Sequence, residues 1–217
     1  MSDRHSLEAL AMSNFAVGQP VRRSEDHTLV RGQGQYTDDV DLPGQVYAAM
    51  VRSQVAHGII RGIDTAAALA MPGVLAVYTG ADLATAGYGG ITSKVPLKNR
   101  DGSAMKAPER PALCTDKVRF VGDPIACVIA TSARDAAEAA EAVAVDIEPL
   151  PAVLDMRTAA TSAAPPVWDG APDNVCLDYL YGEPDKVAAA LAGAHHVTRM
   201  RLENKRLVVN AMEPRAC

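Results

Sequence analysis

The feature that most constrains the fold is a pattern of strand, helix and strand that occurs twice, at residues 58–78 and 124–148. In each copy a short apolar run, typical of a strand, leads into an alanine-rich stretch and then into a second apolar run. A further strand is predicted at residues 45–52, before the first copy. The pattern predicts two similar units of mixed helix and strand that pack side by side, and therefore an α+β fold.

Residues that favour the start or the end of a helix flank the alanine-rich stretches and support the two predicted helices. Asp64 precedes the first alanine-rich stretch and the pair Pro72-Gly73 follows it, so the sequence predicts a short helix capped by Asp64. In the second copy Ser132 and Asp135 have the spacing of a capping box. Alanine and glutamate after them favour a longer helix.

A long segment, residues 80–117, separates the two copies. Glycine and proline interrupt any period there, and its polar run offers no apolar face, so we expect one long loop that ends in a strand at 117–121. Connections longer than about 12–15 residues without regular structure are usually functional or disordered. The loop is therefore expected to lie against another domain.

Beyond the second copy the composition changes to that of a linker, rich in Ala, Thr, Ser and Pro. After it the sequence predicts strands at 176–181 and 195–202 and a helix at 184–191, with residues 195–213 forming a hairpin. The predicted organisation is an N-terminal arm (1–27), a first domain (28–155), a linker (156–173) and the truncated start of a second domain (174–217).

Composition excludes several classes of function. The formal net charge is −5 and the basic residues are scattered, so no nucleic-acid partner is expected. The N-terminal region lacks an apolar signal-peptide core, and no apolar stretch approaches the roughly 20 residues of a membrane span, so a cytoplasmic location without a membrane partner is expected.

The residues that carry chemistry form no site of recognisable spacing. The four cysteines, Cys114, Cys127, Cys176 and Cys217, form no CxxC pair and are expected to be reduced thiols. The adjacent His195 and His196 would point to opposite faces of a strand and could not serve one metal ion. No pairing of a nucleophile with a base stands out. The chain is therefore expected to hold neither a catalytic residue nor a metal.

Several segments, each weak alone, resemble one family when taken in order. They are RRSED (22–26), GQGQYTDD (32–39), RS (52–53), AH (56–57), PGV (72–74), YTGAD (78–82), KVRFVGDP (117–124), DAAE (135–138), EPLPAV (148–153) and MEPR (212–215). In series they resemble the large subunit of the molybdenum hydroxylases, which are the xanthine dehydrogenases, aldehyde oxidases and aerobic carbon monoxide dehydrogenase-like enzymes.

The resemblance implies an α/β hammerhead domain at residues 28–155, followed by the start of a molybdopterin-binding domain. It implies an oxidoreductase that hydroxylates or oxidises a purine, an aldehyde, an N-heterocycle or CO, with water as oxygen source. The cofactor would be molybdopterin, as the cytosine dinucleotide, and partner subunits would carry 2Fe-2S clusters and FAD. The catalytic glutamate and the pterin-binding loops would lie beyond residue 217, so this part alone would be inactive and hold no cofactor.

The same resemblance gives three candidate pocket residues near the end of the chain: Lys205, Glu213 and Arg215. Glu213 and Arg215 match the family's Met-Glu-Pro-Arg motif. Lys205 stands where the family often has a glutamine that can reach a molybdenum oxo group. The alternative is a stand-alone hammerhead protein that acts as a binding or assembly module without catalysis.

Overall fold

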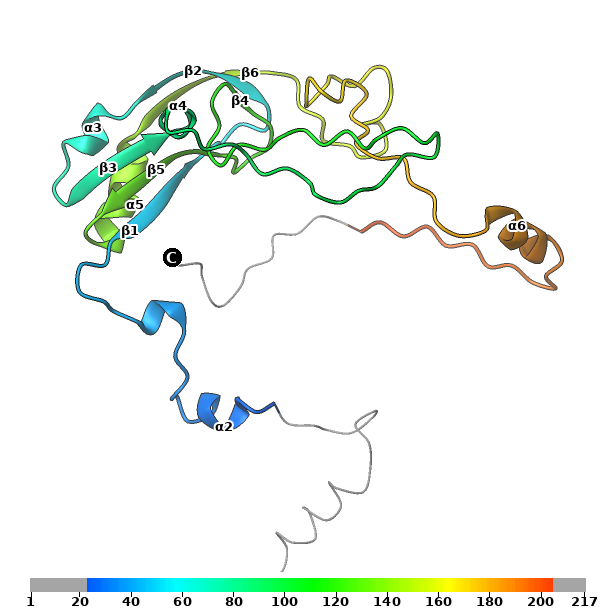
Figure 1. Cartoon of the computed structure of the whole chain (residues 1–217), viewed down its shortest axis with the longest axis horizontal. Coiled ribbons are helices and arrows are strands. Elements are labelled where there is room, and N and C mark those ends of the chain that lie inside the picture. Colours follow the sequence, from blue (N-terminus) through cyan, green and yellow to red (C-terminus); the bar gives the residue numbers. More distant parts are fainter. Residues whose placement is uncertain (1–22, 205–217) are drawn as a thin grey trace, which may run out of the picture. The chain divides into compact units, whose positions relative to one another are not determined.

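The computed structural model describes residues 23–204, which contribute to two compact units. One unit comprises Met1–Pro43 and Leu202–Cys217, and its described elements are the helix α2 (Asp26–Leu29) and the 3-10 helix η1 (Thr37–Asp39). The other unit is Gly44–Arg201 and contains every described strand (Figure 1).

The strands of the Gly44–Arg201 unit form two antiparallel sheets of three strands each. Sheet A has the order β1-β5-β3 and sheet B the order β4-β2-β6. The strands are β1 (Tyr47–Arg52), β2 (Gly58–Asp64), β3 (Val74–Thr79), β4 (Lys117–Val118), β5 (Pro124–Ala130) and β6 (Ala144–Pro149).

Each predicted strand–helix–strand unit exists, but each one crosses from one sheet to the other. The first runs from β2 in sheet B to β3 in sheet A, and the second runs from β5 in sheet A to β6 in sheet B. The two units lie side by side as predicted, because β5 pairs with β3 and β6 pairs with β2. The two strands of each unit are therefore not neighbours in one sheet.

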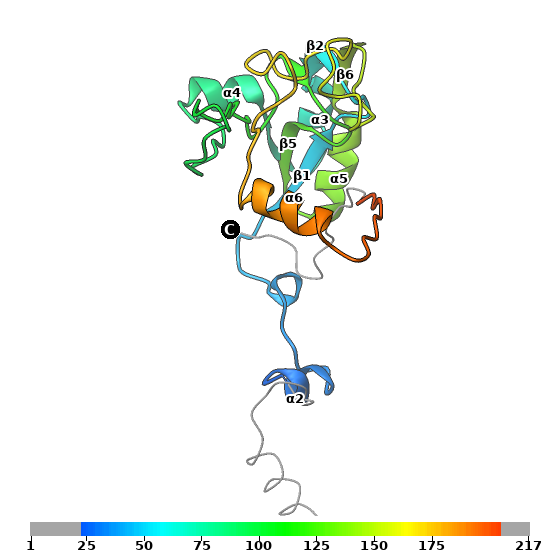
Figure 2. The same cartoon turned by 90° about the vertical axis from the view of Figure 1, so that its right-hand side faces the viewer.

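Four helices accompany the sheets in this unit: α3 (Ala66–Leu69), α4 (Gly80–Thr85), α5 (Ala133–Ala142) and α6 (Pro184–Ala192). The predicted cap at Ser132 is confirmed, because its hydroxyl accepts a hydrogen bond from the Asp135 amide at 3.1 Å. The N-cap of α3 is Thr65 and not Asp64, although the Asp64 carboxylate accepts a hydrogen bond from the Ala66 amide at 2.9 Å. Helix α5 contacts β1, β5 and α3 (Figure 2).

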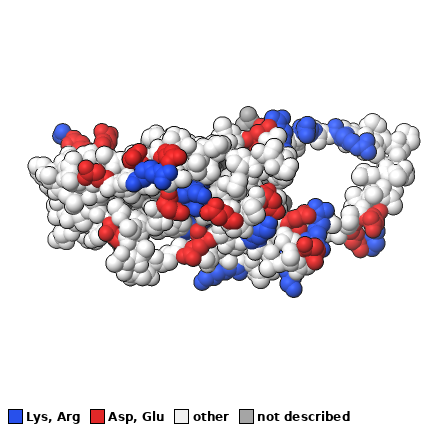
Figure 3. Space-filling view, turned by 90° about the horizontal axis from the view of Figure 1, so that it is seen from above, with Lys and Arg blue, Asp and Glu red and all other residues white. Residues whose placement is uncertain are grey.

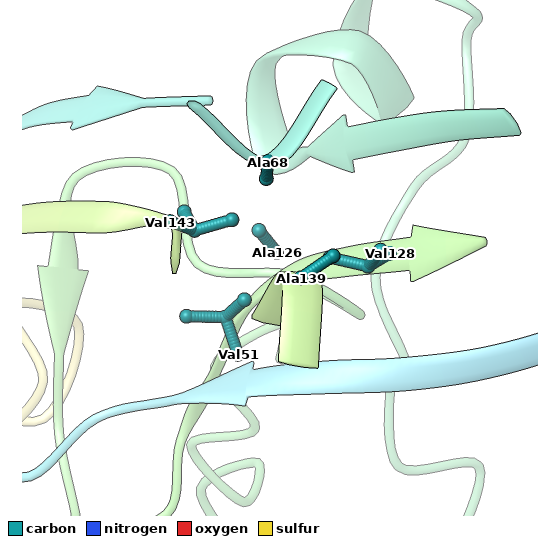
Figure 4. Packing of buried hydrophobic residues seen from close by; sticks show 6 residues of the cluster. All are labelled: Val51, Ala68, Ala126, Val128, Ala139 and Val143. Carbon is teal, nitrogen blue, oxygen red and sulfur yellow. The ribbon is translucent and has the colours of Figure 1, made fainter. Parts of the chain in front are cut away.

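The main core lies where α5 and α3 meet sheet A. Its buried residues are small: Val51, Ala68, Ala126, Val128, Ala139 and Val143 (Figure 4). Alanine at the contacts of both helices lets their backbones approach the sheet closely, and close packing makes such positions sensitive to added volume. A second cluster, Cys114, Val118 and Ile125, lies under sheet B.

Several sequence-based expectations differ from the structure. The segment 80–117 begins with helix α4 because Thr79 and Asp82 form a capping box, a signal hidden by the glycines that follow. The strand expected at 117–121 ends at Val118, where the chain turns away. Residues 176–181 and 195–202 form no strand, since apolar alternation alone does not supply a pairing partner. The rest of the hairpin expected at 195–213 lies outside the described residues.

One face of the surface carries charges of both signs close together. Figure 3 shows Lys and Arg interleaved with Asp and Glu over one face. Many of these charges pair, and some of the pairs join segments that are distant in the sequence. Within residues 23–204, no helix has the length and apolar character needed to cross a membrane.

Candidate functional site

The site residues proposed from the sequence, Lys205, Glu213 and Arg215, all lie outside the described residues. In the described part of the chain no three His, Cys, Asp or Glu side chains come together in a way that could hold a metal ion. The ring Nε2 of His196 lies 3.1 Å from the hydroxyl of Thr198, two residues away. His195 and His196 thus take part in no such cluster among the described residues.

Four motif residues gather at a polar junction, which consists of Ser53, His57, Arg119 and Asp123. Ser53 and His57 stand between β1 and β2, while Arg119 and Asp123 stand between β4 and β5. Ser53, His57 and Asp123 are buried, with 1%, 4% and 8% of their surface exposed. Buried polar groups usually have hydrogen-bond partners. Two buried nitrogens of the junction, His57 Nε2 and Arg119 Nε, have none among the described residues.

Backbone contacts join the two connections. The Ser53 amide donates to the Asp123 carbonyl at 2.9 Å, and the Gly122 amide donates to the Ser53 carbonyl at 2.7 Å. Gly122 has a φ of +90°, a conformation that favours glycine. The Gly122 amide is thus used inside the protein, and the Ser53 hydroxyl donates to the Val55 carbonyl at 2.7 Å.

Asp123 accepts a hydrogen bond from the Arg119 amide at 2.9 Å. Beside it lies Cys114, only 2% exposed. Burial is the main cause that raises the pKa of the Cys114 thiol to about 12, and the neighbouring Asp123 carboxylate acts in the same direction. A thiol of this kind stays protonated and is not a nucleophile at neutral pH.

His57 fixes the end of sheet B to the segment that follows it. Its ring Nδ1 lies 2.8 Å from the Pro151 carbonyl oxygen. Because a carbonyl can only accept, Nδ1 carries the proton. The Arg119 guanidinium lies over the Trp168 ring, 4.0 Å from its centroid. The junction therefore contacts both strand connections and the chain that follows sheet B.

A second set of contacts, the clasp, joins residues 99–119 to residues 168–178 (Figure 1). Three ion pairs form it: Arg100 Nη2 with Asp178 Oδ1 at 2.6 Å, Lys106 Nζ with Asp173 Oδ1 at 2.7 Å, and Lys117 Nζ with Asp169 Oδ1 at 3.2 Å. Their order shows that the two segments run antiparallel.

Backbone hydrogen bonds reinforce the clasp. The Arg100 amide donates to the Asp178 carbonyl and the Lys106 amide donates to the Cys176 carbonyl, each at 2.9 Å. The hydrogen bond from Lys106 holds the pKa of the Asp173 carboxyl below its usual value. The long loop, expected to lie against another domain, lies in the structure against residues 168–178 of the same compact unit. The sequence interpreted those residues as the end of a linker and the start of a strand.

The clasp could not be predicted from the sequence, because its residues lie far apart in the chain and form no motif. Arg100 and Asp178 are 78 positions apart, and each is an ordinary exposed charge when taken alone. Trp168 is the only tryptophan of the chain, which is the one signal that could have marked this segment. In the described residues the polar junction and the clasp hold chain segments that are distant in the sequence in fixed positions.

We expect the clasp to protect its two segments from proteolysis. The combined variant Asp169→Asn, Asp173→Asn and Asp178→Asn removes three attractions but keeps every Lys and Arg that trypsin requires. Cleavage after Lys98, Arg100 and Lys106 should become several-fold faster, and high salt should act in the same direction because exposed pairs are screened. The rates are measured by mass spectrometry of the peptides.

The matched control for the clasp is Asp155→Asn, which breaks only the local ion pair with Arg157. This variant should leave the cleavage rates in residues 94–106 unchanged. Equal rates in the triple variant and the unchanged protein would show that the ion pairs do not hold the loop.

We also expect the described cysteines to differ sharply in reactivity. Cys114, Cys127 and Cys176 are free thiols, and Cys176 is exposed. Since the thiolate is the reactive form, iodoacetamide at pH 8 should modify Cys176 quickly and Cys114 only after unfolding. Peptide mapping of native and urea-treated samples measures this difference, and rapid native labelling of Cys114 would contradict the buried junction.

Residues 31–151 match the family described as aldehyde oxidase and xanthine dehydrogenase, a/b hammerhead domain. The chain is similar to the nicotine 6-hydroxylase large subunit of Paenarthrobacter nicotinovorans, with 36% identity over 204 residues, which are 93% of this chain and 24% of that protein. It is also similar to the carbon monoxide dehydrogenase large chain of Afipia carboxidovorans, with 39% identity over 144 residues, or 66% of this chain and 16% of that protein.

Among solved structures, the Cu,Mo-CO dehydrogenase resembles this chain with a TM-score of 0.57 and 38% sequence identity. The likeness covers 68% of this chain and 17% of that one. The chain thus spans about a quarter or less of the length of the relatives it matches.

Proposed function

This chain belongs to the aldehyde oxidase and xanthine dehydrogenase family, through its hammerhead domain, and from that membership we propose that it is the N-terminal region of a molybdenum hydroxylase large subunit. The relatives are oxidoreductases, and their names identify several of them as subunits of larger complexes. The proposed whole enzyme hydroxylates or oxidises a small substrate, with water as the oxygen source.

One observation carries this proposal: the similarity continues past the hammerhead domain. The family match ends at residue 151, whereas the similarity to the nicotine 6-hydroxylase large subunit covers 93% of this chain. Residues beyond 151 therefore resemble the continuation of a large subunit. The clasp is consistent with this assignment, because it ties that continuation to the hammerhead loop.

The cofactor of the proposed enzyme is a molybdopterin, which supplies the redox chemistry at the metal. Residues 23–204 do not fit it, because no three His, Cys, Asp or Glu side chains among them form a cluster that could hold a metal ion. We therefore assign to this region the positioning of strands and of the chain that follows them. Iron–sulfur clusters and FAD are proposed for partner subunits.

The end of the chain is where this region would approach the pocket. We propose that Glu213 and Arg215 form part of its wall, with Lys205 nearby. The proposed boundaries are an arm at 1–27, the hammerhead domain at 28–155, a linker at 156–173 and the start of a molybdopterin-binding domain at 174–217. With these boundaries, two ion pairs of the clasp, Lys106 with Asp173 and Lys117 with Asp169, would connect the linker to the hammerhead domain.

Metal content tests the proposal. We expect the product of the complete reading frame, purified from cells that make the cofactor, to contain about one molybdenum per chain by elemental analysis. The 217-residue chain from the same cells should contain none. A reading frame that stops after Cys217 would favour the stand-alone module, and stoichiometric molybdenum in the 217-residue chain would overturn the assignment of the cofactor to later residues.

A further inference from the structure

An apolar groove lies between β1, α5 and β6, away from the clasp. Its volume is about 710 Å³. Fourteen residues line it, and ten of them are apolar: Ala49, Met50, Val51, Val55, Ile125, Ala137, Ala140, Val143, Val145 and Ile147. The others are Arg52, Ser53, Gln54 and Glu141. Val51 and Val143, labelled in Figure 4, belong both to the core and to the wall of this groove.

The groove follows the edge of a strand. Seven consecutive residues, 49–55, line it, so side chains from both faces of β1 border it together with the backbone between them. Strand β1 is an edge strand of sheet A, since β5 is its only strand partner among residues 23–204. An added strand requires backbone N–H and C=O groups along a sheet edge, with an apolar groove beside them for its side chains.

This edge lacks the features that usually protect an exposed one. Natural edge strands are blunted by inward charges, lysines, prolines or short length. Strand β1 has six residues, YAAMVR, with a single charge at its end, and Met50 is 44% exposed. The Arg52 guanidinium donates to the Gly122 carbonyl at 2.9 Å, so even this charge is partly engaged inside the protein. Such an edge is expected to be covered in the working protein.

We propose that an extended apolar segment from a later part of the same large subunit adds to β1 and fills the groove between α5 and β6. This inference rests on the proposed function. The chain spans 24% of one relative and 16% of another, so the greater part of a subunit of that length lies outside these 217 residues. A tethered segment also has a high effective concentration, which favours it over separate molecules.

The apolar composition of the groove indicates a permanently bound segment. Permanent interfaces resemble a domain core and are depleted of charge, whereas separable partners meet over more polar surfaces. Only Arg52 and Glu141 carry charge in the lining. The expected segment alternates, with Val, Ile or Leu facing α5 and β6, and carries no charge at the positions over Ala137 and Ala140.

Cysteine labelling in the complete subunit tests the inference. Ala137→Cys places a thiol on an exposed groove position of α5, and Ala84→Cys places one on an exposed position of α4, which contacts β3 at the opposite edge of sheet A. The rate of maleimide labelling at each position is followed by peptide mass spectrometry, with urea-unfolded protein as the reference. Native cysteines do not interfere because each peptide is read separately.

We expect position 137 to react at least about ten times more slowly than position 84 in the isolated, monomeric subunit, since a covered thiol reacts only when the segment opens. Equal rates would overturn the inference. So would protection that appears only when partner subunits are added or only at concentrations where the subunit dimerises, because the occupant would then be another molecule.

Failure of the inference can be distinguished from failure of the proposed function. A subunit that contains molybdenum but labels equally at both positions would contradict the groove occupant alone. A reading frame that ends after Cys217 would contradict both, because no later segment would exist.

Discussion

His57→Ala is expected to lower the free energy of unfolding by about 3–5 kcal/mol, the range for removing a large buried ring and leaving an acceptor unsatisfied. The residue is only 4% exposed, and its ring Nδ1 donates to the Pro151 carbonyl at 2.8 Å. Its loss leaves a cavity between the start of β2 and the segment after β6. Urea unfolding monitored by circular dichroism measures the change.

His57→Asn is the matched variant. The asparagine Nδ2 can take the position of the histidine Nδ1 and donate to Pro151, so this variant should keep the hydrogen bond while losing part of the ring volume. It should therefore recover a substantial part of the stability lost in His57→Ala. Equal losses in the two variants would show that ring packing alone matters and that the hydrogen bond contributes nothing.

The sheets could be predicted from the sequence because their signals are local. Strand β5 is a continuous apolar run, and α5 is bounded by Ser132 and built from alanine. The exchange of strands between two sheets could not be predicted, since it depends on which strand reaches which edge. Pairs such as Tyr78 with Cys127 join residues far apart, and no local propensity specifies them.

The polar junction was only partly accessible to sequence reasoning. Ser53, His57 and Asp123 belong to segments that resemble the hammerhead family, which marks them as a group but gives no contact between them. The clasp was not accessible, because Arg100 and Asp178 become partners only after both segments pack against each other. The expected strand at 176–181 was wrong because that segment pairs with a loop and not with a sheet edge.

Gly80→Ala is expected to destabilise the protein by about 3 kcal/mol, at the upper end of the usual cost of overpacking, because the atoms it meets are backbone. Gly80 begins α4, directly after β3. A Cβ there would lie 2.6 Å from the Cys114 carbonyl oxygen and 2.7 Å from the Leu113 carbonyl oxygen. Neither oxygen can rotate away as a side chain would, so α4 or the segment 113–114 must move.

Gly62→Ala provides the comparison, since a Cβ on this β2 residue meets no atom within 4 Å and its backbone is not left-handed. Its stability should stay within about 0.5 kcal/mol of the unchanged protein or rise slightly, through a smaller loss of chain entropy on folding.

The reactivity of Cys114 provides a second measurement of the collision between position 80 and the polar junction. A Cβ at position 80 would collide with the backbone of Cys114 and displace it. Gly80→Ala should therefore accelerate iodoacetamide labelling of Cys114 in the native state, while Gly62→Ala should not. Equal stability of the two variants, with Cys114 protected in both, would mean that α4 does not pack against the junction as closely as the structure shows.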